Sequence, residues 1–153
     1  MADVDVKIEG LDEVLRKMGV LKDKRKIRNA AMRAARKGMN VVRDAARQNA
    51  KAIDDPETSE KIWRNISVSA GKTKSLDLVQ MRVGVRGGAS YSNPTPPNTS
   101  GGDTRYWRFL EYGTSEMPAT PFMRPALANN VQKVTDTFSQ SFSAELDKEI
   151  AKL

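Results

Sequence analysis

The chain has 153 residues, of which 39% are hydrophobic and 29% charged, a composition typical of a single folded domain. Cysteine and histidine are both absent, which excludes disulfides, thiol chemistry, and the commonest metal ligand and general base. The formal net charge of +7 favours a polyanion or an acidic protein surface as a neighbour. We therefore expect no enzyme, no metal and no cofactor. No apolar run approaches the roughly 20 residues of a membrane span.

The first segment of the chain combines two periodic patterns. In "VDVKIEG" apolar and polar residues alternate, which predicts a half-buried strand that ends at Gly10. The following "LDEVLRKMGVL" predicts a short helix, because its apolar residues recur at helical spacing. The apolar face of this helix consists of Leu11, Val14, Leu15 and Met18.

A long helix is predicted from about Asp23 to Ala52, a stretch that is rich in alanine and has no proline. Its apolar stripe is made mostly of small residues, so we expect it to pack closely against a sheet or another helix. The stripe comprises Ile27, Ala30, Ala31, Ala34, Ala35, Gly38, Val41, Val42, Ala45 and Ala46.

The same helix carries most of the positive charge of the chain. Residues 22–51 contain eleven basic residues against Asp23 and Asp44, an excess larger than the net charge of the whole chain. Such a helix can face DNA or an acidic partner, although a charged helix face is more often solvated or lies between subunits. The candidate contact residues are Arg25, Arg28, Arg33, Arg36, Lys37, Arg43 and Arg47.

Two alternating segments, residues 63–70 and 78–85, predict an antiparallel hairpin whose strands are joined through "GKTKS". Residues 86–104 follow, rich in glycine, proline, serine, threonine and asparagine and without periodicity. A loop of this length is unusual in a compact domain. We expect it to be flexible or to become ordered on a partner.

Residues 105–112 predict a further strand, with Trp107, Phe109 and Glu111 on one face. The glycine and prolines that follow predict a rigid elbow between this strand and a C-terminal helix. We expect Glu111 to be paired with an arginine of its own chain or of a neighbouring subunit, because an unpaired carboxylate among aromatic residues is costly to bury. The elbow and interface candidates are Glu111, Gly113, Pro121, Phe122, Arg124 and Pro125.

The C-terminal helix is predicted from about Pro125 to Lys152, with an apolar stripe that winds around it. The early part of the stripe can face the same sheet as the long helix, and its late part requires a bend or a neighbouring subunit. The predicted fold is a single α+β domain over residues 1–153. In it the long basic helix and the C-terminal helix pack on a small antiparallel sheet, and residues 86–104 form a long Pro/Gly-rich loop.

The segment "FLEYGTSEMPATPFMRPAL" resembles the hallmark of a family of small structural proteins from long-tailed bacteriophages and prophages. Two further segments agree: "VKIEGLDEVLRKM" looks like the opening strand and helix of that family, and "TSEKIWRNISV" is similar to the segment entering its first hairpin. The chain departs from the usual pattern at Ser59, where glycine is common, and in its proline-rich insertion. Family members are minor tail, tail-completion or neck proteins, similar to the lambda minor tail protein Z group.

The resemblance implies an α+β subunit of a ring, by family a hexamer, which joins the head-proximal end of the tail to the DNA-filled head. Its partners would be other copies of itself, adjacent neck, connector and tail proteins, and DNA in the lumen through non-specific contact, with no membrane. Its location would be the neck or tail of a virion assembled in the host cytoplasm. Two alternatives stay open: another neck component, such as a tail terminator or head-closure protein, and a basic nucleic-acid-binding protein.

Overall fold

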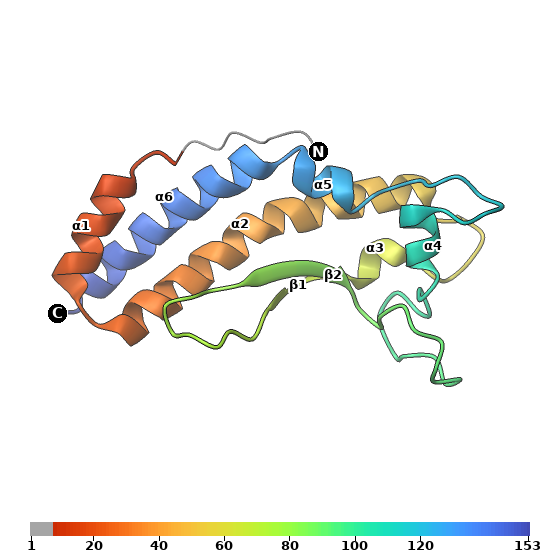
Figure 1. Cartoon of the computed structure of the whole chain (residues 1–153), viewed down its shortest axis with the longest axis horizontal. Helices are drawn as coiled ribbons and strands as arrows, with labels where there is room; N and C mark the ends of the chain where they lie inside the picture. Colours follow the sequence, from red (N-terminus) through yellow and green to blue (C-terminus); the bar gives the residue numbers. More distant parts are fainter. Residues whose placement is uncertain (1–7) are drawn as a thin grey trace. The chain divides into compact units, whose positions relative to one another are not determined.

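The structure is a computed structural model that describes residues 8–153. The strand predicted from "VDVKIEG" falls largely outside the described residues. Within them no helix is long and apolar enough to cross a membrane. The elements, in chain order, are α1 Leu11–Leu21, α2 Lys24–Ile53, α3 Ile62–Asn65, β1 Ile66–Ala70, β2 Met81–Val85, α4 Trp107–Tyr112, α5 Arg124–Ala128 and α6 Val131–Ile150 (Figure 1).

Contacts within the chain group its residues into two compact units. The first unit contains α1, the beginning of α2 as far as Val41, residues 69–82, and residues 130–153 with α6. The second unit contains residues 42–68, which include the rest of α2, and residues 83–129. The α+β class is confirmed, with its long helix, small sheet and C-terminal helix. The division of the chain into domains stays a prediction.

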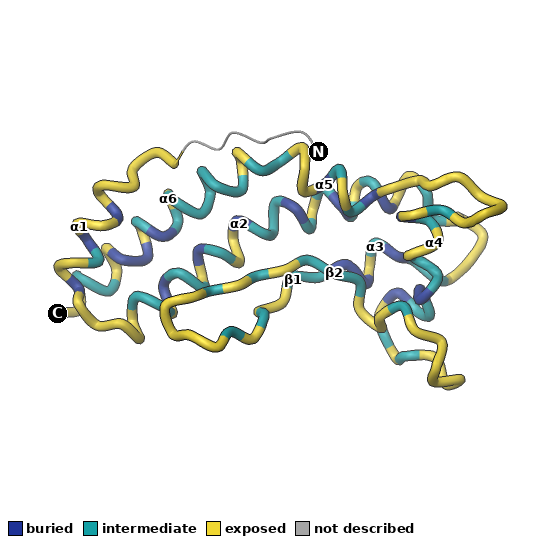
Figure 2. The backbone as a smooth tube through the Cα atoms, in the orientation of Figure 1, coloured by how far each residue is buried: buried dark blue, intermediate teal, exposed yellow. Residues whose placement is uncertain are grey.

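The long helix α2 lies within one residue of its predicted bounds. It begins after Asp23, whose Oδ1 accepts hydrogen bonds from the backbone N–H groups of Arg25 (3.0 Å) and Lys26 (3.2 Å), and so caps the helix. The predicted stripe of small residues is confirmed, and its buried positions recur at every fourth residue along α2 (Figure 2). These buried positions are Ala30, Ala34, Gly38, Val42, Ala46 and Ala50.

In the first unit, α6 comes close to the backbone of α2 at Gly38. A Cβ built on this glycine would lie 3.2 Å from the carbonyl oxygen of Val134 and 3.4 Å from its Cγ1. The core beside this contact contains Ala30 and Ala34 of α2 together with Phe142 and Leu146 of α6. The small side chains of α2 therefore let two helices approach more closely than larger ones would.

The late part of the α6 stripe is covered by α1, not by a bend or a neighbouring subunit, so that expectation was wrong. Val14 and Leu21 of α1 share one buried cluster with Phe142 and Leu146 of α6. The predicted apolar face of α1 was also partly wrong, because Leu11 and Leu15 are exposed. The buried face of α1 is rotated toward Val14, Lys17 and Leu21.

The buried face of α1 includes a charged residue, Lys17, which is only 8% exposed. Its Nζ donates hydrogen bonds to Ser143 Oγ (2.6 Å) and to Asp147 Oδ2 (2.9 Å), both on α6. Desolvating an ammonium group without partners costs several kcal/mol. These two contacts therefore allow Lys17 to lie in the interface between α1 and α6.

The predicted hairpin is confirmed as a two-stranded antiparallel sheet, with strands shorter than expected because Trp63 and Arg64 belong to α3. Two backbone hydrogen bonds just outside the strands frame its register: Arg86 N to Asn65 O (2.7 Å) and Gly71 N to Gln80 O (2.9 Å). The connection between the strands is held in the first unit by Arg28 of α2. The guanidinium of Arg28 donates to the carbonyl oxygen of Leu78 at 2.6 Å.

The strand predicted at residues 105–112 is wrong, because Trp107–Tyr112 form helix α4. Alternation and helical spacing both place Trp107 and Glu111 on one face, so the pattern did not distinguish the two. Tertiary contacts favour the helix over the strand. The ring of Trp107 packs edge to face against Phe122 with centroids 6.4 Å apart, while Phe109, which a strand would place on the same face, is exposed. A C-terminal helix is confirmed, but its prediction as one continuous helix from about Pro125 was wrong. The segment is divided into α5 and α6 at residues 129 and 130, both asparagine, a residue type that favours helix ends.

The close approach at Gly38 can be tested with two glycine variants. Gly38→Leu should lower the free energy of unfolding by about 1–3 kcal/mol, because the added side chain has to displace Val134. The matched control is Gly19→Ala in α1, where a Cβ meets nothing within 4 Å. This exchange should raise the free energy of unfolding by up to about 1 kcal/mol. Urea denaturation measures both, and equal effects would contradict the packing described here.

Candidate functional site

The carboxylate of Glu111 is the centre of the candidate site in the second unit. Glu111 is 1% exposed, at the end of α4. Its Oε2 accepts hydrogen bonds from the backbone N–H groups of Phe122 (2.7 Å) and Met123 (2.9 Å). Its Oε1 accepts from the backbone N–H of Arg124 (2.9 Å) and from the Nε of Arg124 (3.1 Å). One carboxylate thus holds the three residues that lead into α5.

The predicted arginine partner of Glu111 is Arg124, and it belongs to the same chain. Besides the carboxylate, its Nη2 binds the carbonyl oxygen of Glu111 at 2.6 Å. The guanidinium also lies over the ring of Tyr112, 4.8 Å from the ring centre. The side chain of Arg124 thus donates hydrogen bonds to both the carboxylate and the carbonyl oxygen of Glu111 and stacks on the neighbouring tyrosine. These contacts connect the end of α4 to the start of α5.

Residues 113–123 connect α4 to α5, and we name the part from 113 to 121 the elbow loop. Gly113 has φ of 75°, and a Cβ there would lie 2.8 Å from the nitrogen of Ala119, so this position requires glycine. The backbones of Thr114 and Met117 bond to each other in both directions, and Thr120 N donates to Leu110 O at 2.7 Å. The elbow loop is therefore closed on itself and attached to α4.

The six predicted elbow residues come together in the second unit. Phe122 is fully buried, and its carbonyl oxygen accepts a hydrogen bond from Asn49 of α2 at 3.2 Å. Pro125 lies in the first turn of α5, and Pro121 is exposed at the end of the elbow loop. The elbow joins two helices, however, and not the strand and helix that the sequence predicted.

Hydrogen bonding keeps Glu111 ionised. Burial alone raises the pKa of its carboxyl group, but the backbone N–H groups of Met123, Phe122 and Arg124 and the guanidinium of Arg124 more than offset this effect. The pKa of Glu111 therefore lies below its ordinary value. A charged carboxylate with both oxygens engaged is suited to holding the backbone rather than to exchanging a proton. Among residues 8–153 no three histidine, cysteine or acidic residues are placed to hold a metal ion.

Most of the seven candidate residues on the basic helix have partners within their own unit. In the first unit Arg28 binds the hairpin connection, while Arg33 pairs with Glu145 of α6 at 2.8 Å. In the second unit Arg47 donates twice to the carbonyl oxygen of Ile66, at 2.7 and 3.1 Å. Lys37 approaches Glu145 at 4.0 Å, and Arg43 pairs with Asp44 at 2.9 Å. The main-chain N–H of Arg25 binds Asp23, and Arg36 has contacts of its own.

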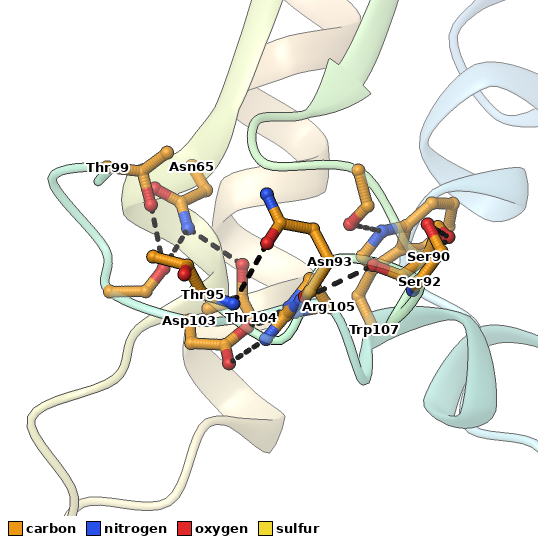
Figure 3. Close-up of polar contacts among 12 residues, drawn as sticks. Asn65, Ser90, Ser92, Asn93, Thr95, Thr99, Asp103, Thr104, Arg105 and Trp107 are labelled. Atoms are coloured by element: carbon orange, nitrogen blue, oxygen red, sulfur yellow. Dashed lines mark hydrogen bonds and ion pairs between the residues drawn. The ribbon is translucent and has the colours of Figure 1, made fainter. Parts of the chain in front are cut away.

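The loop at residues 86–104 is attached by Arg105, a buried residue that the sequence analysis missed (Figure 3). The guanidinium of Arg105 pairs with both carboxylate oxygens of Asp103 (2.8 and 2.9 Å) and donates to the carbonyl oxygen of Asn93 at 2.7 Å. It also stacks over the ring of Tyr91, 4.6 Å from the ring centre. The side chain of Arg105 thus contacts the loop at three residues, Tyr91, Asn93 and Asp103.

A second missed residue, Asn65, holds the other end of this loop and is fully buried (Figure 3). Its side-chain amide donates to Thr104 Oγ1 (2.7 Å) and Gly102 O (3.1 Å), and its Oδ1 accepts from Gly101 N (2.8 Å). A Cβ on Gly101 would collide with the carbonyl oxygen of Lys61. The only sequence signal was the pair of glycines at 101 and 102 beside Asp103 and Arg105. The expected flexibility of the loop stays a prediction.

Several large side chains around the elbow are exposed instead of buried. Phe109 and Tyr112 lie on α4, Met117 on the elbow loop and Leu127 on α5. The elbow loop is exposed almost throughout, as the tube between α4 and α5 shows in Figure 2. Aromatic residues and methionine are enriched at protein interaction surfaces, so these side chains are candidates for contact with a partner.

Removing the charge of Glu111 should destabilise the fold in a pH-dependent way. At pH 7, Glu111→Gln is expected to lower the free energy of unfolding by about 3 kcal/mol, because three backbone N–H groups and Arg124 lose their anionic partner. The pKa of Glu111 is lower in the folded chain than its ordinary value of 4.5, so this stabilisation is complete above pH 4.5 and is lost below it.

Urea denaturation from pH 7 downward should therefore show the difference between wild type and Glu111→Gln shrinking below pH 4.5. Glu116→Gln, five residues further along and exposed, is the matched control and should change stability by less than about 0.5 kcal/mol. A Glu111→Gln variant as stable as the control would contradict the role assigned to this carboxylate.

The attachment of the loop can be tested at Asn65. Asn65→Ala should cost about 2 kcal/mol of stability, because it leaves buried polar groups without a partner. It should also make limited proteolysis within residues 86–104 several-fold faster. Asn98→Ala, on the exposed part of the same loop, is the control. Equal cleavage of the wild type and Asn65→Ala would mean that the loop is mobile despite these contacts.

Comparison with known proteins identifies a family. The family described as "Bacteriophage HK97-gp10, putative tail-component" matches residues 12–113, well over half of the chain, from α1 to the glycine that ends α4. No curated protein and no solved structure matches significantly. The elbow loop beyond Gly113, α5 and α6 lie outside the matched residues. The chain belongs to the HK97-gp10-like family of bacteriophage tail components.

Proposed function

We propose that this phage tail component is the tail-completion or head-tail joining protein, which forms a ring at the head-proximal end of the tail. The observation that carries the proposal is the elbow clamped by Glu111 and Arg124. Its hydrogen bonds hold a surface-exposed loop and exposed apolar side chains in one conformation. Such an arrangement favours binding to protein, because a pre-organised surface loses little conformational entropy on association.

A structural role agrees with the chemistry of the elbow. Both oxygens of Glu111 are engaged by N–H donors, and Arg124 is committed to the same carboxylate. Family membership makes the chain a structural component of the virion, in contact with other virion proteins. Its position in the neck, its self-association and its hexameric ring are what we propose beyond that.

The basic helix contributes less to this proposal than its charge suggested. Arg28, Arg33 and Arg47 each bind groups of their own chain, so their charge is partly neutralised or directed inward. We propose that contact with DNA in the lumen is non-specific and secondary to contact with protein. A different neck component, such as a tail terminator or head-closure protein, would use the same elbow.

The decisive experiment is reconstitution with isolated tails that lack this protein. The purified chain should bind in a fixed number of copies to the head-proximal end of such tails, visible by electron microscopy, and should make them competent to join heads. The Glu116→Lys variant changes an exposed charge on the elbow loop and should still fold. Its binding to the same tails is measured in parallel, to show whether binding depends on this loop. Binding along the tube or at the distal end would contradict the proposal.

A titration of free duplex DNA at physiological salt tests the remaining alternative, a basic nucleic-acid-binding protein. We expect weak binding that is independent of the ability to complete tails. High affinity with a steep salt dependence, together with no binding to tails, would instead identify a nucleic-acid-binding protein.

A further inference from the structure

The first unit contains an open apolar groove of about 730 Å³. Met18 of α1, Ile27 of α2, and Phe138 and Phe142 of α6 line it, and the hairpin connection, held by Arg28, forms a further wall. This volume lies within the range of about 300–1,000 Å³ that is typical of binding pockets in proteins. Phe142 is buried, but Met18, Ile27 and Phe138 are each partly exposed, so part of the apolar lining is accessible at the surface.

The rim of this groove is positively charged. Lys22 and Lys24 line it and are exposed, and residues 22–28 contain five basic residues against the single Asp23. Asp23 is occupied by the backbone N–H groups that it caps. Within residues 8–153 no carboxylate forms an ion pair with Lys22 or Lys24, and Asp77 is the one acidic residue that lines the groove. The groove therefore favours an apolar segment with a negative charge.

The elbow loop in the second unit carries that combination. Its tip consists of Glu116, Met117 and Pro118, all exposed. The backbone N–H groups of Glu116 and Met117 bind Thr114 Oγ1 at 3.2 and 3.1 Å, which fixes the turn. In the described part of the chain the carboxylate of Glu116 has no ion pair. The tip is thus a rigid projection with an adaptable apolar side chain beside a free negative charge.

We propose that the tip of the elbow loop of one copy docks into the groove of the next copy. Met117 and Pro118 lie against the apolar lining, and Glu116 faces Lys22 and Lys24. This inference rests on the proposed self-assembly and names the surfaces that carry it. Because the groove and the loop are different surfaces of one chain, each copy has one of each. The contact is therefore heterologous and can be repeated from copy to copy until a ring closes.

A second copy fits the groove better than an unrelated partner for two reasons. The charge and polarity of the two surfaces are complementary, and both belong to the same chain. In addition, the loop is already held in shape by Gly113, Thr114 and the Glu111 carboxylate, so docking costs little entropy. Glu116 and Lys24 are expected to fix the orientation, and Met117 to supply the buried area.

Complementary variants test this contact. The loop variant is Glu116→Lys with Met117→Ser, and the groove variant is Lys22→Glu with Lys24→Glu. Each alone should lose self-association, measured as mass in solution by light scattering or ultracentrifugation. Mixed in equal amounts, they should form a dimer that does not grow, because only one intact loop and one intact groove remain. Glu57→Lys, on another exposed turn, should assemble like the wild type.

A cross-linking measurement covers the case in which copies associate only on tails. The natural chain has no cysteine, so single thiols can be introduced cleanly. A chain with Met117→Cys, mixed with a chain carrying Met18→Cys in the groove, should give a cross-linked pair in the assembled state. Val20→Cys, exposed on the same helix but not lining the groove, should give at least tenfold less.

The outcomes separate this inference from the proposed function. Wild-type chains that complete tails while the loop and groove variants assemble normally would overturn the inference and leave the function intact. No dimer in the mixture and no cross-link, with both thiols reactive, would also overturn it. If the mixed variants form a dimer but the wild-type chain does not complete tails, the contact is supported and the proposed function is contradicted.

Discussion

The charge of Glu111 is the constraint on which the elbow depends. A carboxylate buried this completely is stable only if its lost hydration is replaced, and here four N–H donors replace it. Three of these donors are consecutive backbone groups, so the carboxylate fixes the path of the chain and not merely one side chain. The burial of Phe122, the start of α5 and the shape of the elbow loop all follow from this one anion. Removing it would leave several groups without partners at once.

Local pattern was sufficient to predict α2 and the hairpin because each has one dominant period. The run of small residues in α2 could be assigned before any partner was known, since close helix packing requires small side chains whatever the partner is. The segment at 105–112 had no such single solution, because Trp107 and Glu111 lie on one face in a strand and in a helix alike. The cover that α1 provides for α6 was also not predictable. It depends on a contact between residues more than a hundred positions apart, such as Lys17 and Ser143.

The candidate site shows the same division between local and distant determinants. Gly113, Pro121 and Pro125 were identified because their backbone preferences are properties of the residue itself, and Glu111 because a lone carboxylate among aromatic residues demands a partner. Asn65 and Arg105 gave no such signal. Their partners are mostly carbonyl oxygens and small polar groups of a loop without periodicity, and only the folded chain brings these groups within hydrogen-bonding distance of Asn65 and Arg105.

Lys17 shows how α1 finds a unique position on α6. Apolar side chains alone would tolerate a shift of one turn, because a leucine or valine packs acceptably in several grooves of a neighbouring helix. A shift of that kind would carry the ammonium away from Ser143 and Asp147 and leave a desolvated charge in the interface. Apolar burial thus gives the attraction between the two helices, while a single buried cation selects their register. In the first unit a buried charge therefore disfavours other registers of α1 on α6.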